Sequence, residues 1–202
     1  MIYRGKNTMN HSNLVYRLMT LCCCLLSICF AGKVLAAESH RFMFAAYKQT
    51  QYNSSNGMPS DEANTITQTR DGYLWIGSYS GLMRFNGQVF QPMKDVDDQI
   101  ISRVRCLYED SRHRLWIGTT NDGAYCYENG LIRQTDSLHA TNQRAIAEDK
   151  EGRIYIGAAE GVAIYDEKQA EPLSWINDPR LENHMTVSLT ADLEGKIGRA
   201  HV

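Results

Sequence analysis

A short phrase built around an aromatic residue, an isoleucine and a glycine recurs three times along the chain. The copies read YLWIGS, RLWIGT and RIYIGA, and their aromatic residues Trp75, Trp116 and Tyr155 lie 41 and 39 residues apart. A period near 40 residues, with one short aromatic strand in each unit, is typical of repeat proteins and favours the blades of a β-propeller. The repeat therefore argues against a self-contained catalytic fold.

Turn residues divide each unit into short strands. Asp-Gly, Asn-Gly and Ser-Gly pairs recur between the apolar runs, as expected for hairpins. Gly72 and Gly152 stand at the first turn because it needs a positive φ, and His113 takes their place in the second unit as a tolerated variant. The positions that we assign to the repeat itself, all structural, are Trp75, Gly77, Trp116, Gly118, Tyr155, Gly157, Gly72 and Gly152.

The strand that carries the aromatic residue is apolar on both faces. Such a strand must be covered on both sides, and this happens when each blade lies between two neighbours. We therefore predict that Trp75 and Trp116 pack between blades, the alternative being a stacking platform for a sugar ring or a base. The predicted fold is all-β. After an N-terminal signal or anchor segment, we expect three four-stranded propeller blades and the start of a fourth, which together form an incomplete propeller.

The boundaries of the units follow from the period. We expect a signal peptide or membrane anchor at 1–37, a lead-in at 38–63, blades at 64–102, 103–142 and 143–185, the start of a fourth blade at 186–196 and a tail at 197–202.

The tail departs from the repeat. Where the fourth aromatic strand is due, residues 197–202 read IGRAHV, which one reading frame of a common sequencing-library adapter encodes. We therefore hypothesise that this tail is not native; the alternative is a natural truncation.

Two stretches carry a family resemblance. Residues 69–87 and 109–123 closely resemble the two-component regulator propeller repeat, and residues 56–60 resemble the Gly-Leu-Pro stretch that commonly precedes the first such blade. The resemblance covers roughly residues 41–196. In that family the propeller is an extracytoplasmic sensor domain. A Tyr-rich β-sandwich, a transmembrane helix and a cytoplasmic histidine kinase or diguanylate cyclase (GGDEF) domain typically follow.

The resemblance implies that this chain is the extracytoplasmic ligand-sensing portion of a membrane-bound signal-transduction receptor, truncated before its output domain. The implied partners are an unidentified extracytoplasmic ligand and the membrane, reached through the N-terminal segment or a missing C-terminal helix, with a homodimer as one arrangement of the full-length receptor. The repeat is structural in this family, so no catalytic residue or ligand contact is carried over. The alternative function is a secreted propeller enzyme or binding protein acting on carbohydrate or another small ligand.

The charge of the chain argues against nucleic acid as a partner. The formal net charge is -2, and basic and acidic residues alternate through residues 90–170 without a basic stripe. A phosphate-binding surface needs a local excess of Lys and Arg.

The N-terminus has the pattern of a targeting segment. Residues 1–17 carry basic but no acidic side chains, and residues 18–37 are almost wholly apolar or small. The uncharged core, about 15 residues, is shorter than the roughly 20 that span a bilayer. We therefore favour a cleaved signal peptide, with cleavage after Ala36, over an uncleaved anchor. Both place the later residues on the extracytoplasmic side of the bacterial cell membrane.

The cysteines divide between this segment and the predicted blades. Cys106 and Cys126 lie in the blades, where their spacing leaves a disulfide and two buried free thiols equally open. The other four are interpreted as small apolar residues of the signal segment, because bulky Leu21 and Ile28 stand before the first and the last of them, where a lipoprotein signal needs a small residue. They are Cys22, Cys23, Cys24 and Cys29.

No arrangement of side chains predicts catalysis, a metal or a cofactor. Asp95, Asp97 and Asp98 lack the glycine and the terminal glutamate of a calcium loop, so we expect a solvated loop. The six histidines form no close pair, and no Ser or Cys nucleophile can be paired with a base. The chain is therefore not expected to be an enzyme.

Overall fold

The computed structural model describes residues 49–135, 141–169, 173–180 and 184–201. The chain divides into two compact units, Met1–Gln51 and Tyr52–Val202. The predicted signal segment, its four cysteines and residues 38–48 of the lead-in lie outside the described residues. The strands described below all belong to the second unit.

The described residues form strands and no helix, as the repeat predicts. The first sheet contains β1 (Thr65–Gln68), β2 (Leu74–Gly77), β3 (Leu82–Phe85) and β4 (Phe90–Pro92). The second contains β5 (Val104–Glu109), β6 (Leu115–Thr119), β7 (Ala124–Glu128) and β8 (Leu131–Gln134). The third contains β9 (Ala145–Glu148), β10 (Ile154–Gly157), β11 (Val162–Tyr165) and β12 (Leu173–Trp175).

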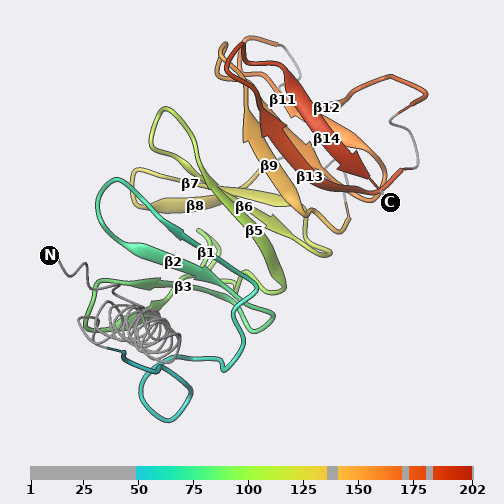
Figure 1. The fold of residues 1–202 in the computed structure, drawn as a ribbon. Helices are drawn as coiled ribbons and strands as arrows, with labels where there is room; N and C mark the ends of the chain where they lie inside the picture. Colours follow the sequence, from blue (N-terminus) through green and yellow to red (C-terminus); the bar gives the residue numbers. More distant parts are fainter. Residues whose placement is uncertain (1–48, 136–140, 170–172, 181–183, 202) are drawn as a thin grey trace, which may run out of the picture. The chain divides into compact units, whose positions relative to one another are not determined.

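Each sheet is an antiparallel meander whose strands pair in chain order, visible in Figure 1 as successive hairpins. The prediction of four-stranded blades is confirmed, and we call the three sheets blades 1, 2 and 3. A two-stranded hairpin follows, made of β13 (Thr186–Ala191) and β14 (Ile197–His201). Because backbone pairing does not depend on the origin of the side chains, the hypothesis about residues 197–202 stays a prediction.

Consecutive sheets pack through their first strands. β5 contacts β1 and β2, β9 contacts β5 and β6, and β13 contacts β9 and β10. The same backbone hydrogen bond recurs at the three junctions. In each, an N–H at or shortly before the first strand of one sheet donates to the carbonyl of the residue that follows the repeat glycine (Gly77, Gly118 or Gly157) in the preceding blade. The pairs are Val104 to Ser78 (3.0 Å), Gln143 to Thr119 (3.0 Å) and Thr186 to Ala158 (2.9 Å).

The repeat glycine at or next to the end of each second strand leaves room for the next sheet. An added Cβ on Gly157 would lie 2.6 Å from Cγ2 of Thr186. An added Cβ on Gly118 would overlap Sγ of Cys106, in its own blade, and lie 3.1 Å from Cβ of Gln143, in the next. Gly77 meets Val104 in the same way. The side chain that approaches each glycine most closely from the next sheet belongs to the residue that donates the junction bond.

We expect Gly118→Ala to destabilise the full chain by about 1–3 kcal/mol, because the new methyl group overfills a packed junction. Cys106→Ala removes the sulfur that the methyl group would overlap. The double variant should therefore lose less stability than the sum of the two single variants. Urea denaturation of the four proteins measures this coupling. Simple additivity would contradict the junction geometry.

The turn between the first and second strands has the predicted backbone conformation. Gly72 and Gly152 have φ values of 90° and 79°, and His113 has φ 66°. The prediction that histidine replaces glycine at a positive-φ position is confirmed.

Trp75 and Trp116 lie between consecutive blades, with 0% and 1% of their surfaces exposed. The ring of Trp75 contacts that of Tyr127 at a centroid distance of 4.7 Å, and Trp116 contacts Tyr165 at 4.9 Å. Both tyrosines pair with the start of the second strand in their own blade. The third repeat aromatic, Tyr155, is only partly buried.

The end of the lead-in covers the other face of blade 1. Met58 packs with Ile76 and Phe85 in a small apolar cluster. The ring of Tyr52 lies edge-on to Phe85 at 5.2 Å and to Phe90 at 5.1 Å. Phe85 occupies the position of Tyr127 and Tyr165 in the later blades, so Tyr52 stands where a preceding blade would supply its aromatic residue.

Candidate functional site

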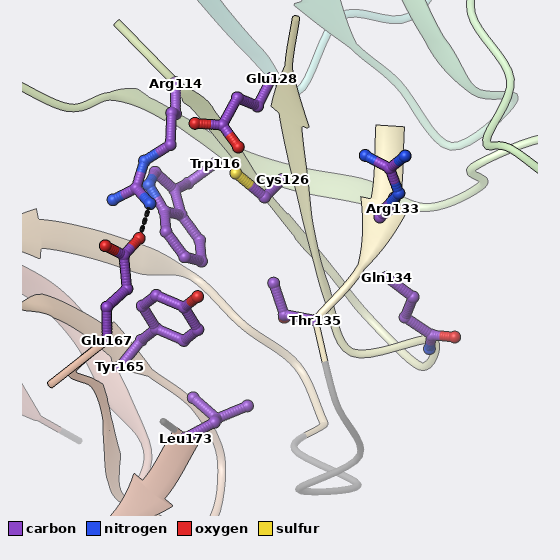
Figure 2. Close-up of a pocket in the computed structure, with 10 residues that line it drawn as sticks. All are labelled: Arg114, Trp116, Cys126, Glu128, Arg133, Gln134, Thr135, Tyr165, Glu167 and Leu173. Carbon is purple, nitrogen blue, oxygen red and sulfur yellow. Dashed lines mark hydrogen bonds and ion pairs between the residues drawn. The ribbon is translucent and has the colours of Figure 1, made fainter. Parts of the chain in front are cut away.

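A pocket of about 310 Å³ opens between blades 2 and 3. Figure 2 shows Trp116 and Tyr165 near its centre, with Arg114 and Glu167 on one side and Arg133 and Gln134 on the other. The lining residues are Arg114, Trp116, Cys126, Glu128, Arg133, Gln134, Thr135, Tyr165, Glu167 and Leu173.

The pocket combines an aromatic floor with a polar rim. The floor is formed by Trp116 and Tyr165, whereas Glu128, Arg133 and Gln134 are exposed. Aromatic surface with a few polar groups at its margin is the usual composition of a small-ligand site. This pocket is therefore the candidate functional site.

Asp110 holds one wall of the pocket in place. Its side chain is fully buried. Its carboxylate accepts hydrogen bonds from Nε of Arg114 (2.6 Å), Nε1 of Trp116 (2.9 Å) and the backbone N–H groups of Arg112 (3.0 Å) and Arg114 (2.9 Å). Burial acts to raise the pKa of Asp110, but the hydrogen bonds from Trp116 and Arg114 and the Arg114 charge outweigh it and lower the pKa. Asp110 is therefore ionised at neutral pH.

Glu167 joins this wall to blade 3. Its carboxylate pairs with the guanidinium groups of Arg112 and Arg114, the latter drawn as the dashed line in Figure 2. Burial opposes ionisation of Glu167, but the bonds and charges of the two arginines lower its pKa. Only 5% of the Arg114 side chain is exposed, and its Nη2 is buried without a hydrogen-bond partner among the described residues. A buried cation thus links the two blades at the edge of the pocket.

The Asp110 arrangement recurs in the neighbouring blades. Asp149 accepts from Nε of Arg153 (2.6 Å) and from the hydroxyl of Tyr155 (3.1 Å). In blade 1 the hydroxyl of Thr69 accepts from Nε1 of Trp75 (3.0 Å). Each acceptor precedes its aromatic residue by six positions, a regular spacing that is already visible in the sequence and could have identified these acceptors.

The residue before each of these aspartates connects to the preceding blade. Glu109 accepts from the backbone N–H of Arg70 (3.1 Å), and Glu148 accepts from the backbone N–H (2.7 Å) and hydroxyl (2.6 Å) of Ser111. The fourth unit has Ala191 at this position. In each Glu-Asp pair, the glutamate therefore accepts hydrogen bonds from the preceding blade, and the aspartate accepts hydrogen bonds within the turn of its own blade.

The two cysteines of blade 2 are free thiols. Cys106 lies on β5 and Cys126 on β7, with β6 between them. Burial raises the pKa of each thiol to about 12. Both are therefore protonated at neutral pH and unsuited to nucleophilic catalysis, although Cys126 lines the pocket.

In the aspartate-rich loop of blade 1, Asp95 and Asp98 are bonded to groups of the same loop. Asp95 accepts from the backbone N–H groups of Asp97 (2.9 Å) and Gln99 (2.8 Å), and Asp98 pairs with Lys94 at 2.8 Å. Within the described ranges, no three potential metal ligands gather at one point. In the same ranges, no helix has the length and apolar character needed to cross a bilayer.

Antiparallel four-stranded meanders that pack through their first strands define a β-propeller-type protein. The family model of the two-component regulator propeller matches residues 57–80 and 98–121. Two segments of the chain thus match the two-component regulator propeller repeat, and the resemblance inferred from the sequence is confirmed.

Solved structures of similar fold include extracellular domains from B. thetaiotaomicron. Those of the hybrid two-component systems BT3049 and BT4673 have TM-scores of 0.63 and 0.64 and identities of 22% and 25%, over 76% of this chain. This chain spans only 23% and 22% of their lengths. A virginiamycin B lyase from Staphylococcus aureus is similar at TM-score 0.53 and 13% identity, covering 71% of this chain and 50% of the lyase. A comparison with curated protein sequences finds no match.

Proposed function

We propose that this chain is the extracytoplasmic ligand-sensing propeller portion of a membrane-bound signal-transduction receptor. The observation that carries the proposal is the pair of two-component regulator propeller repeats in blades 1 and 2. The likeness to extracellular domains of two-component systems supports it, as does the targeting pattern of residues 1–37.

The pocket between blades 2 and 3 offers a physical route for sensing. Its floor and rim come from both blades, and Glu167 of blade 3 binds Arg114 of blade 2 at its edge. A ligand that contacts both blades would favour one packing of the two over another, and such differential contact is what allows a ligand to shift a conformational equilibrium.

The lyase and lactonase structures of similar fold do not favour a catalytic alternative. Their identities to this chain are 12% to 15%. Similarity at this level shows a shared fold but not a shared activity. Function has to be argued from the site, and the two thiols of blade 2 are protonated.

Export and signalling are tested together in the native bacterium. In spheroplasts, added protease should degrade the chain while a cytoplasmic marker survives, and deletion of the gene should abolish the induction of a set of transcripts by an external nutrient. Protection from protease would contradict export. Release of the protein into the medium, with unchanged transcription in the deletion strain, would favour the secreted binding protein or enzyme.

The same assay tests the pocket. Arg133 and Arg70 are both exposed arginines, but only Arg133 lines the pocket. Arg133→Ala should weaken induction at least tenfold, whereas Arg70→Ala should leave it within twofold. Equal responses of the two variants would remove the pocket from the proposal.

A further inference from the structure

Three arginines stand at the leading ends of the first strands of blades 2 and 3. Arg103 and Arg105 flank Val104, the first residue of β5, and Arg144 directly precedes β9. Arg105 and Arg144 are equivalent, since the residue after each pairs with the repeat glycine of the second strand, Gly118 or Gly157. Because consecutive sheets meet at their first strands, these arginines lie at two successive junctions.

Hydrogen bonds tie the first two arginines to blade 1. Nη1 of Arg105 donates to the hydroxyl of Tyr79 at 2.7 Å, and the Arg105 guanidinium carbon lies 5.8 Å from the centre of that ring. The backbone N–H of Arg103 donates to the carbonyl of Tyr79 at 3.0 Å. One tyrosine therefore holds both residues.

The chain of hydrogen bonds continues to the third arginine. The carbonyl of Arg103 accepts from the backbone N–H of Thr120 (3.0 Å), whose own carbonyl accepts from the N–H of Asn142 (2.6 Å). The side-chain oxygen of Asn142 then accepts from Nε of Arg144 (3.4 Å). The three arginines thus belong to one continuous network across three blades.

The backbone at this end is strained in a repeated way. Arg103 has φ 53° and Asn142 has φ 54°, and each directly precedes the residue that donates a junction bond. Left-handed conformations are uncommon for residues other than glycine, and they concentrate at functional sites. Blades 2 and 3 therefore hold the same left-handed conformation beside these arginines.

Among the described residues, no carboxylate pairs with the arginines of this cluster, Arg103, Arg105 and Arg144. The side-chain partners of Arg105 and Arg144 are a phenol and an amide, which carry no charge. At the opposite end of the same blades, arginines do pair with carboxylates; they are Arg112, Arg114 and Arg153.

We propose that the Arg103–Arg105–Arg144 cluster binds a small multivalent anion that carries carboxylate, sulfate or phosphate groups. Guanidinium groups bind such groups through two parallel hydrogen bonds, and the neutral network holds the arginines without competing for their charge. The cluster is distinct from the pocket between blades 2 and 3. The proposal does not depend on the sensing role, because its test measures binding directly.

Isothermal titration of the full chain with citrate, sulfate and inorganic phosphate, at constant ionic strength set with chloride, tests the proposal. At least one of the three anions should bind. The anion that binds most tightly shows whether the site prefers carboxylate groups, as in citrate, or sulfate or phosphate groups. The double variant R105Q/R144Q should bind it at least tenfold more weakly, as expected for the loss of charge-assisted hydrogen bonds.

The matched control is R70Q, which removes one exposed positive charge from the opposite end of blade 1 and should change binding by less than twofold. Circular dichroism and thermal melts establish that the variants are folded. If the double variant unfolds, R144Q alone, which keeps the Arg105–Tyr79 bond, should weaken binding about threefold or more. Absence of binding by all three anions, or equal weakening in R70Q, would overturn the proposal.

Discussion

Asp110→Ala is expected to lower the free energy of unfolding of the full chain by about 3–5 kcal/mol, the usual cost of removing one partner from a buried ion pair. The substitution leaves the Arg114 guanidinium, 5% exposed, without its fully buried counterion, so that only the partly exposed Glu167 still pairs with it. It also removes the acceptor for Nε1 of Trp116 and for the backbone N–H groups of Arg112 and Arg114. Urea denaturation of the variant and the parent protein measures the loss.

Asp149→Ala is the matched control, since Asp149 has the same role in blade 3. Its side chain is as buried as that of Asp110, but its partner Arg153 is 38% exposed and stays hydrated when the carboxylate is lost. We expect a loss of about 1–2 kcal/mol, from hydrogen bonds alone. Equal losses in the two variants would mean that burial of the Arg114 charge does not set the cost.

Trp116→Ala is expected to destabilise the chain by about 3–5 kcal/mol, because the variant leaves a large cavity in a close-packed junction. The ring contacts Tyr165 across the junction and donates to Asp110 within its own blade. The loss therefore weakens both the turn of blade 2 and its packing on blade 3. Thermal and urea melts of the full chain measure it.

Two further variants separate the contributions of this residue. Trp116→Phe keeps an aromatic ring and loses the Nε1 bond to Asp110, so it should cost less than Trp116→Ala. Tyr155→Ala removes the equivalent aromatic from blade 3, where the ring is only partly buried, and should cost about half as much. A loss from Tyr155→Ala as large as that from Trp116→Ala would contradict the assignment of the cost to burial.

The blades were predictable because their signals are local. Strand and turn residues recur within a few positions of each other, so the period of Trp75 and Trp116 reveals the sheets, and the glycine at the first turn reveals a positive φ. His113 could be assigned to that turn for the same reason. None of these inferences requires knowledge of how one blade sits on the next.

Apart from the packing of Trp75 and Trp116, the contacts between blades were not predictable from the same signals. The bonds from Arg70 to Glu109 and from Ser111 to Glu148 join residues 39 and 37 positions apart, and they depend on how the sheets twist and pack. The pocket was even less predictable from the sequence, because much of its rim comes from β8, where no motif repeats. The role of Asp110 was partly predictable. Its six-residue spacing to Trp116 can be read from the sequence, but the burial of its side chain cannot.

The way the junctions are divided has a consequence for how such a protein changes in length over evolution. At each junction, the earlier unit supplies a glycine and a carbonyl, and the later unit supplies an N–H and a side chain from at or near the start of its first strand. A duplicated segment of one full period carries both halves, wherever in the unit the duplication starts. One recombination event can therefore add a blade without a compensating second mutation, whereas gain of half a period would leave two mismatched junctions.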